Sequence, residues 1–277
     1  MKKILVTTDF SDNANHALEY AMQLFKYEDC QFYVLHVLKA STFISDDLMS
    51  MSPTTSLYEQ LIASAKLKLD RYIDTVKSKH NNILHEFVPV IDYDNLVAAI
   101  NQLVDKHDIQ LAIMGTKGAS NMAKKIMGSN TMRVIQGCHV SVLAIPHNYN
   151  YKPIHRVAFT SNYENTYCKT DLSPLINLVE QKDYQVSILH VSDSNVLTKE
   201  QELVKASLDD CFENATHQFV EIEKGAFLSA VNHYIESNSI DMFAMVNRKH
   251  GFWENLFAEN KIEKVAYNIT IPLLAIS

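Results

Sequence analysis

The stretch LAIMGTKGASNMAKKIMGSNTMRVI, residues 111–135, runs from an apolar segment through a glycine-containing segment into a helical pattern. Its first four residues predict a buried strand, and residues 129–137 predict a helix. Between them, Gly115, Gly118 and Gly128 have the spacing G-x2-G-x9-G, although the whole chain contains only six glycines. Half of all glycines therefore fall in one short segment, which indicates a specialised backbone at this place.

This glycine segment is typical of a phosphate site. A residue without Cβ lets the backbone bend sharply and lets a ligand approach closely. The amino end of a helix offers unpaired N–H donors and a partial positive charge, both of which suit an anion. Ser129 and Thr131 can add hydroxyl donors, and Lys117 can add charge. The alternative is a plain turn followed by an ordinary capping serine, which accounts for one of the three glycines.

The charge pattern around this segment points the same way. The chain has a net charge of -7, yet residues 109–163 contain no Asp or Glu and several Lys and Arg. An acid-free window in an acidic protein is consistent with an anion site, whereas the overall charge argues against a broad nucleic-acid surface. Neither G-x4-G-K-[ST] nor GxGxxG is present, so the sequence does not resemble a Walker-type ATPase or a dinucleotide dehydrogenase.

The chain also repeats itself in order. Five segments of the first half match five of the second, displaced by 131 to 154 positions. The pairs are LVTTDF (5–10) with AFTSNY (158–163), VLHV (34–37) with ILHV (188–191), HEFVPV (85–90) with HQFVEI (217–222), DIQLAIMG (108–115) with SIDMFAMV (239–246), and HVSVLAIP (139–146) with TIPLLAIS (270–277). A repeat of this length sets the architecture.

Within a copy, apolar strand patterns alternate with helical patterns. Strands are expected over residues 3–8, 31–38, 84–90, 111–114 and 140–146, and helices after Ser11 and over residues 57–77, 93–106 and 129–137. This alternation predicts an α/β fold of two tandem Rossmann-like domains, each with a five-stranded parallel sheet core. The expected domains are residues 1–147 and 154–277, joined by the polar linker PHNYNYKPI.

Composition excludes several other classes. No apolar run approaches the roughly 20 residues that a membrane helix needs. The start MKKILVTTDF reaches Asp9 too soon for a secretory signal, so a cytoplasmic protein without a membrane partner is expected. The four cysteines and twelve histidines are scattered without metal-ligand spacing, and no metal ligand is assigned.

Taken together, VTTDFSDNANHALEYA (6–21), the LHV of the second strand, MGTKG…GSNTMRVI and CHVSVLAIP resemble the universal stress proteins over nearly the whole chain. The resemblance implies an adenine nucleotide α-hydrolase-like fold and an ATP site in the first copy. The residues that it implies are Asp9 and Val37 at the adenosine, Met114, Gly115, Lys117 and Gly118 at the ribose and phosphates, and Gly128, Ser129, Asn130 and Thr131 at the phosphates. For Asp9, a helix cap near Ser11 is the alternative.

The second copy departs from this pattern. In an ungapped alignment, Val246, Lys249 and Glu259 replace the three glycines, and Asn162 stands in the place of Asp9. A carboxylate at a helix amino end competes with phosphate for the same donors, so we expect no triphosphate there. The resemblance implies a role in architecture, an intrachain pseudo-dimer formed through residues 140–146 and 271–277. Whether two chains also form a homodimer stays open.

The sequence thus predicts a stress-response protein that binds an adenine nucleotide as a regulatory ligand. ATP with Mg2+ is favoured, and ADP and AMP stay open. One alternative is a slow ATPase, for which the sequence supplies no general base and no catalytic residue. The other is an interaction or ligand-carrier protein in which the nucleotide site is vestigial.

Overall fold

The computed structural model describes residues 1–38, 57–93, 95–116, 128–147, 149–192, 196–223, 227–247 and 270–277. Ten strands and seven helices lie in these ranges. The strands are β1 (Lys2–Thr7), β2 (Cys30–Val37), β3 (His85–Asp92), β4 (Leu111–Gly115), β5 (Val142–Ile145), β6 (Arg156–Thr160), β7 (Gln185–Ser192), β8 (His217–Glu223), β9 (Met242–Val246) and β10 (Leu273–Ile276). The helices are α1 (Asp12–Leu24), α2 (Leu57–His80), α3 (Leu96–His107), α4 (Ser129–Gly137), α5 (Ser173–Lys182), α6 (Lys199–Cys211) and α7 (Phe227–Ser237).

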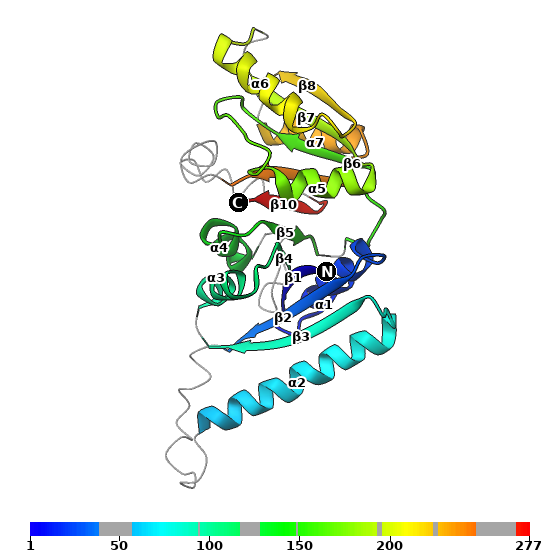
Figure 1. Ribbon diagram of the computed structural model, residues 1–277, viewed down its shortest axis with the longest axis vertical. Coiled ribbons are helices and arrows are strands. Elements are labelled where there is room, and N and C mark those ends of the chain that lie inside the picture. Colours follow the sequence, from blue (N-terminus) through cyan, green and yellow to red (C-terminus); the bar gives the residue numbers. More distant parts are fainter. Residues whose placement is uncertain are drawn as a thin grey trace.

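All ten strands form one sheet, in the order β3-β2-β1-β4-β5-β10-β9-β6-β7-β8 (Figure 1). The first five strands pair in parallel, and so do the last five. The two halves meet where β5 and β10 pair antiparallel. The tandem α/β fold with two five-stranded parallel sheets is therefore confirmed, and so is the predicted pairing of the two final strands.

Helices cover both faces of the sheet, which gives three layers (Figure 1). One apolar cluster joins α1, α2, α5 and α6 to the first face, and another joins α3, α4 and α7 to the second face. Each cluster contains residues from both copies. Side chains alternate between the faces along each strand, as in β1, where Ile4 and Val6 belong to the first cluster and Leu5 to the second.

The predicted elements are present, with ends that differ by a few residues. The helix expected from residue 93 begins at Leu96, because the side chain of Asn95 accepts a hydrogen bond from the Ala98 amide at 2.9 Å and caps it. The strand expected over residues 140–146 is only Val142–Ile145 long, since its pairing with β4 starts at Val142. Boundaries of this kind depend on individual caps and pairings, which periodicity does not specify.

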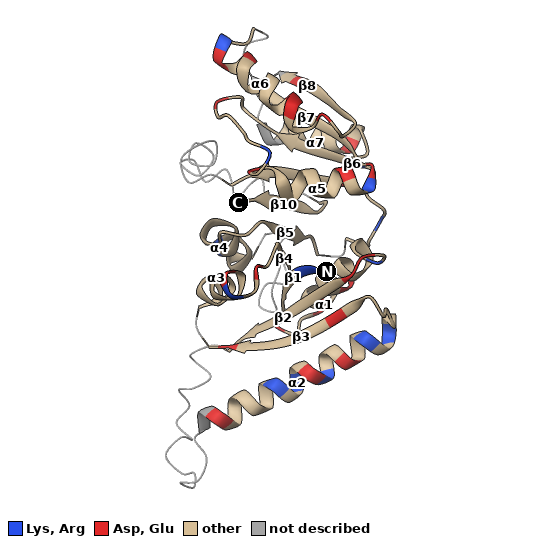
Figure 2. Cartoon of the chain, in the orientation of Figure 1, with Lys and Arg blue, Asp and Glu red and all other residues tan. Residues whose placement is uncertain are grey.

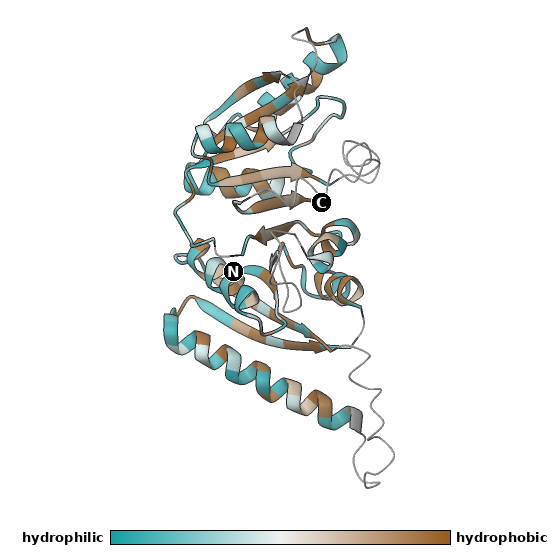
Figure 3. Ribbon diagram, turned by 180° about the vertical axis from the view of Figure 1, so that it is seen from behind, coloured by the Kyte–Doolittle hydropathy of each residue, from teal (hydrophilic) through white to brown (hydrophobic). Residues whose placement is uncertain are grey.

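Charged side chains stay outside the core. Figure 2 shows Lys, Arg, Asp and Glu gathered on helices such as α2, while the strands of the sheet interior carry almost none. Figure 3 shows the same division from behind, with hydrophobic residues concentrated along the strands. Of the helices in the described ranges, none has the length and apolar character required to cross a bilayer.

Candidate functional site

The candidate site lies at the carboxyl edge of the first copy's strands, where the strand order reverses. β1 pairs with β2 on one side and with β4 on the other, so the chain turns in opposite directions after these neighbouring strands. In open α/β sheets, ligands bind at the carboxyl ends of the strands next to such a reversal. The segments after β1, β2 and β4 and the amino end of α4 are the parts that reach this edge.

The segment after β1 is a short turn held by its own side chains. Thr8 Oγ1 accepts a hydrogen bond from the Phe10 amide at 3.0 Å, and Asp9 Oδ1 accepts one from the Ser11 amide at 3.1 Å. Phe10 has a φ of 61°, a left-handed conformation that is uncommon for a bulky residue. Ser11 is the N-cap of α1, with its side chain accepting from Ala14. Asp9 therefore supports the turn, and Ser11 caps α1. Asp9 is exposed and lies beside the reversal of strand order.

Glycine at position 115 is required by the packing of α1. A Cβ built on Gly115 would lie 2.1 Å from Nδ2 and 2.9 Å from the backbone oxygen of the buried Asn13. These distances are shorter than any van der Waals contact. The sequence suggested that a ligand needs the space at Gly115, whereas the first turn of α1 fills it.

The amino end of α4 is tied to the end of β4. The Gly128 amide donates to the Thr116 carbonyl oxygen, and Thr131 Oγ1 donates to the Gly115 carbonyl oxygen at 3.0 Å. Gly128 is the N-cap, without a side-chain capping bond, and the first turn contains no acidic residue. The alternative of an ordinary capping serine at Ser129 is wrong, because Ser129 is already helical. The exposed Ser129 and Asn130 stand at a helix end with a partial positive charge.

The end of β2 contributes a histidine that the sequence analysis did not assign. His36 Nδ1 donates to the Thr8 carbonyl oxygen at 2.8 Å, and its ring lies 4.4 Å from that of Phe10. Burial is the main reason why the pKa of His36 is lowered, so the ring is neutral at pH 7. Lys68 and Tyr72 of α2 contact the other sides of Phe10. The recurrence of the histidine in both copies, VLHV and ILHV, was the available signal.

The structure brings most of the predicted residues to this edge, in different ways. Val37 is half-buried in the last pair of the β2–β3 ladder. Met114 is 5% exposed and packed in the second apolar cluster, so its backbone rather than its side chain faces the edge. Thr131 is buried at 2% and bonded to β4. Lys117 and Gly118 lie outside the described residues. Ligand binding by all ten predicted residues remains a prediction.

The second copy repeats the turn but not the surroundings. Tyr163, with a φ of 55°, occupies the place of Phe10, and its amide donates to Ser161 Oγ at 3.1 Å. His190 Nδ1 donates to the Ser161 carbonyl oxygen, as His36 does to Thr8. The Tyr163 ring stacks on His190 at 4.1 Å and an interplanar angle of 8°. Burial raises the pKa of Tyr163.

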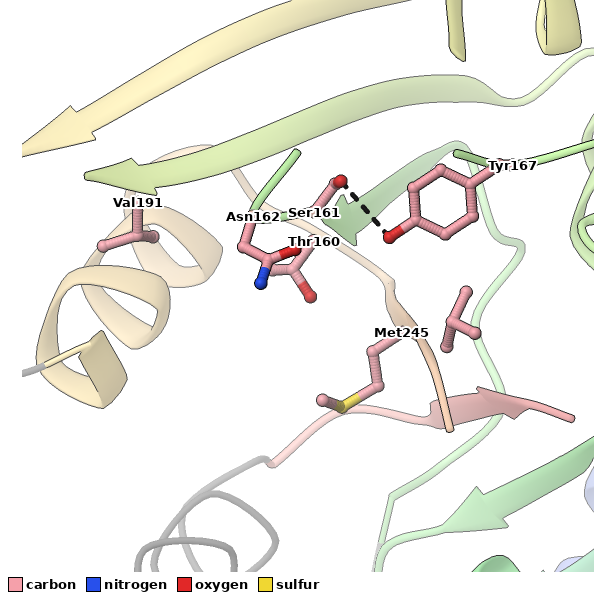
Figure 4. A pocket seen from close by; sticks show the side chains of 7 residues that line it. Thr160, Ser161, Asn162, Tyr167, Val191 and Met245 are labelled. Carbon is pink, nitrogen blue, oxygen red and sulfur yellow. Dashed lines mark hydrogen bonds between the residues drawn. The ribbon is translucent and has the colours of Figure 1, made fainter. Parts of the chain in front are cut away.

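A small cavity marks the corresponding edge of the second copy (Figure 4). Thr160, Asn162, Val191 and Met245 are among its lining residues, and the Tyr167 hydroxyl accepts a hydrogen bond from Ser161 Oγ at 3.3 Å. Its volume of about 20 Å³ has room for one water molecule. Val246 also lines it, in the place of Gly115, whereas Lys249 and Glu259 lie outside the described residues.

The described residues contain no group of three or more His, Cys, Asp and Glu side chains that could hold a metal ion. Fold and site define a tandem, doubly wound α/β protein in which helix α4 of the first copy begins at Gly128, beside the strand-order reversal. A model of the universal stress protein family matches residues 1–146, more than half of the chain. The chain belongs to the universal stress protein family.

Individual relatives agree with this assignment. A universal stress protein of Methanocaldococcus jannaschii is 26% identical over 148 residues, which cover 52% of this chain and 81% of that protein. Another from the same organism is 24% identical over 156 residues, covering 52% and 94%. The crystal structure of a universal stress protein from Archaeoglobus fulgidus has a TM-score of 0.69 at 19% identity, over 99% of this chain and 96% of that one. The similarity in fold thus extends over both copies.

Proposed function

We propose that the first copy binds ATP with Mg2+ as a regulatory ligand and that the second copy serves the architecture of the sheet. The amino end of α4 carries this proposal. It is held against β4 by Gly128 and Thr131 and lies beside the reversal of strand order, and its first turn has no carboxylate. Backbone N–H groups at such an end bind phosphate without any special side chain.

Two further features support an adenine nucleotide in the first copy. Asp9 and the end of β2 lie across the reversal of strand order from the amino end of α4. The edge of the sheet therefore offers a carboxylate near β1 and β2 and a helix end suited to phosphate near β4. In the second copy the small cavity volume of about 20 Å³ and the bulk of Val246 and Tyr167 disfavour a nucleotide. A cytoplasmic location and the association of two chains stay predictions, which fractionation and light scattering test.

Calorimetric titration of the purified chain with ATP and Mg2+ tests the proposal. We expect one site per chain, and at least a tenfold loss of affinity in Gly128→Glu, because the new carboxylate competes with phosphate for the end of α4. The backbone at Gly128 has φ -63° and ψ 148°, which any residue adopts, so the substitution leaves the turn intact. Titrations with ADP and AMP establish which nucleotide is preferred.

Gln136→Glu is the matched control, since it adds the same charge to the exposed last turn of the same helix. Binding in this variant should equal that of the wild type. The absence of ATP binding in the wild type would contradict the proposal, and so would an unchanged affinity in Gly128→Glu. Phosphate release is followed in the same samples, and steady turnover would replace the regulatory role with an ATPase.

A further inference from the structure

The second copy contains a polar groove at the amino ends of its strands. It lies at the amino ends of β6, β7 and β8 and beside the last turn of α7, and its volume is about 420 Å³. This edge of the sheet is opposite to the one that holds the nucleotide-type site. The side chains used in the argument below are Arg156, Gln185, Ser187, Gln218, Tyr234 and Asn238. Ligand sites for small molecules span roughly 300–1,000 Å³, so the groove is large enough for one.

The groove lies where the two copies differ in their large side chains: the second copy lacks the rings of Tyr33 and His107, and Tyr234 stands in the place of Leu103. In the first copy Tyr33, 5% exposed, fills the corresponding place, and its ring lies 4.7 Å from that of His107 at the end of α3. The repeat places Ser187 at the position of Tyr33 and Asn238 at that of His107. Two rings are thus replaced by two short polar side chains, and the neighbouring backbone keeps its register.

The polar atoms of the groove are organised rather than merely exposed. Tyr234 Oη donates to Ser187 Oγ at 3.1 Å, and Gln218 Nε2 donates to the same oxygen at 3.1 Å. Tyr234 and Asn238 are four residues apart and therefore lie on one side of the helix end. Gln185, Ser187 and Gln218 lie on the sheet face that α7 covers, because side chains alternate along paired strands.

The charge of the groove favours an anion. Glu86 of the first copy is replaced by Gln218, so a carboxylate has become an amide. The Arg156 guanidinium donates one hydrogen bond, to the Asn238 carbonyl oxygen at 2.9 Å, and makes no ion pair with any described residue. The nearby Asp241 accepts the backbone N–H groups of His155 and Arg156. His217 and Asp209 neutralise each other when the histidine is protonated.

We propose that this groove binds a small organic carboxylate. The planar guanidinium of Arg156 matches a carboxylate through two parallel N–H···O bonds. Gln185 and Gln218 offer amide N–H groups to the remaining carboxylate oxygens of the ligand. The site is independent of the nucleotide site, since it lies on the opposite edge of the sheet and in the other copy.

Titration of the full-length chain with succinate, followed by calorimetry and by ligand-observed NMR, tests this proposal. We expect one site per chain and at least a tenfold loss of affinity in Arg156→Gln. The matched control is Lys3→Gln, which removes the equivalent cation of the first copy, where Tyr33 fills the space. Its affinity for succinate should equal that of the wild type.

A second variant fills the groove without removing the cation. Ser187→Tyr combined with Tyr234→Leu copies Tyr33 and Leu103 of the first copy and should abolish succinate binding while the thermal midpoint is maintained. Unchanged succinate affinity in this folded variant would overturn the proposal, and so would the absence of binding in the wild type. Inorganic phosphate and glycerol are titrated in parallel, and equal affinity for either would contradict a carboxylate site.

Discussion

Aromatic residues in left-handed conformations mark the same position in both copies. Phe10 and Tyr163 have φ values of 61° and 55°, and each lies beside the histidine of its neighbouring strand. A positive φ is unfavourable for a residue with a bulky side chain, so other contacts must stabilise it. Here the hydroxyl of the residue two positions earlier accepts the amide in each copy. No glycine signals these turns, and for that reason periodicity and composition did not reveal them.

A test at the scale of single residues concerns Gly115. Because a Cβ would lie 2.1 Å from Asn13 Nδ2 and 2.9 Å from its backbone oxygen, Gly115→Ala must displace α1 or β4. We expect a loss of about 1–3 kcal/mol in the free energy of unfolding, which is the usual cost of overpacking a core. Urea denaturation followed by circular dichroism measures it.

The double variant Gly115→Ala with Asn13→Ala identifies the cause of that loss. Removal of the Asn13 side chain eliminates the shortest contact but leaves the backbone oxygen, so part of the stability should return. If the losses in unfolding free energy from the two substitutions were strictly additive, contact with the Asn13 side chain would not be the reason for glycine at position 115.

At the scale of elements, the two copies differ in where their first helix begins. α1 is capped by Ser11, two residues after Asp9, whereas α5 is preceded by Leu172, ten residues after Asn162. The intervening segment of the second copy carries Tyr167, whose hydroxyl lies beside Ser161 and whose carbonyl accepts from Ser207 at 2.7 Å. A residue larger than glycine is therefore tolerated at position 246, because the second copy has no helical turn at the place of Asn13.

A prediction for α4 concerns the hydroxyl of Thr131. It donates to the Gly115 carbonyl oxygen from a side chain that is only 2% exposed, and it anchors the helix end to β4. Thr131→Val keeps the shape but leaves that carbonyl oxygen without its partner, which costs about 1–3 kcal/mol. We expect weaker ATP binding together with a lower denaturation midpoint. Thr131→Ser keeps the hydroxyl and is the control, so equal losses in both variants would argue against the hydrogen bond.

At the scale of the whole molecule, the antiparallel pair β5–β10 joins the two copies. Leu274 pairs with Leu143, and these two residues are 131 positions apart, which is the offset of the repeat in this region. The pseudo-twofold axis that relates the two copies therefore passes between Leu143 and Leu274, which are equivalent residues. The pairing continues the sheet across the junction and leaves neither final strand with an open edge.

Glu28 forms a second link between the copies. Its carboxylate lies 2.6 Å from Lys2 of the first copy and 2.7 Å from Lys182 of the second. Lys182 also donates to the Leu24 carbonyl oxygen, and Lys2 to Gln181. Burial alone raises the pKa of Glu28, but the two lysines outweigh this effect, and the pKa is lowered from its ordinary value.

Glu28→Gln should reduce the free energy of unfolding by about 1.5–3 kcal/mol at neutral pH, because the half-buried charged partner of two lysines is lost. A lowered pKa in the folded state means that the contribution is present above the ordinary value of 4.5 and is lost as pH falls through the folded value. The difference in unfolding free energy between the variant and the wild type should therefore decrease in acid. Chemical denaturation at several pH values measures this difference.

Glu213→Gln is the control for that experiment, since Glu213 pairs with Lys169 within one copy and both side chains are half-exposed. It should leave the unfolding free energy close to that of the wild type. If the difference in unfolding free energy between Glu28→Gln and the wild type stayed constant down to pH 3, the role assigned to the Glu28 carboxylate would be contradicted.

The sequence by itself determined the repeat, the two parallel half-sheets and the segments that meet at the carboxyl edge, whereas the pairing of the final strands came from the resemblance to a known family. These properties follow from local periodicity and from the fixed geometry of parallel strands, so they can be inferred from short stretches. Only the tertiary structure decided that Asn13 fills the space at Gly115, that His36 supports Thr8, and that replacing Tyr33 by Ser187 opens a groove. Each of these depends on atoms far apart in the chain whose packing no local pattern specifies.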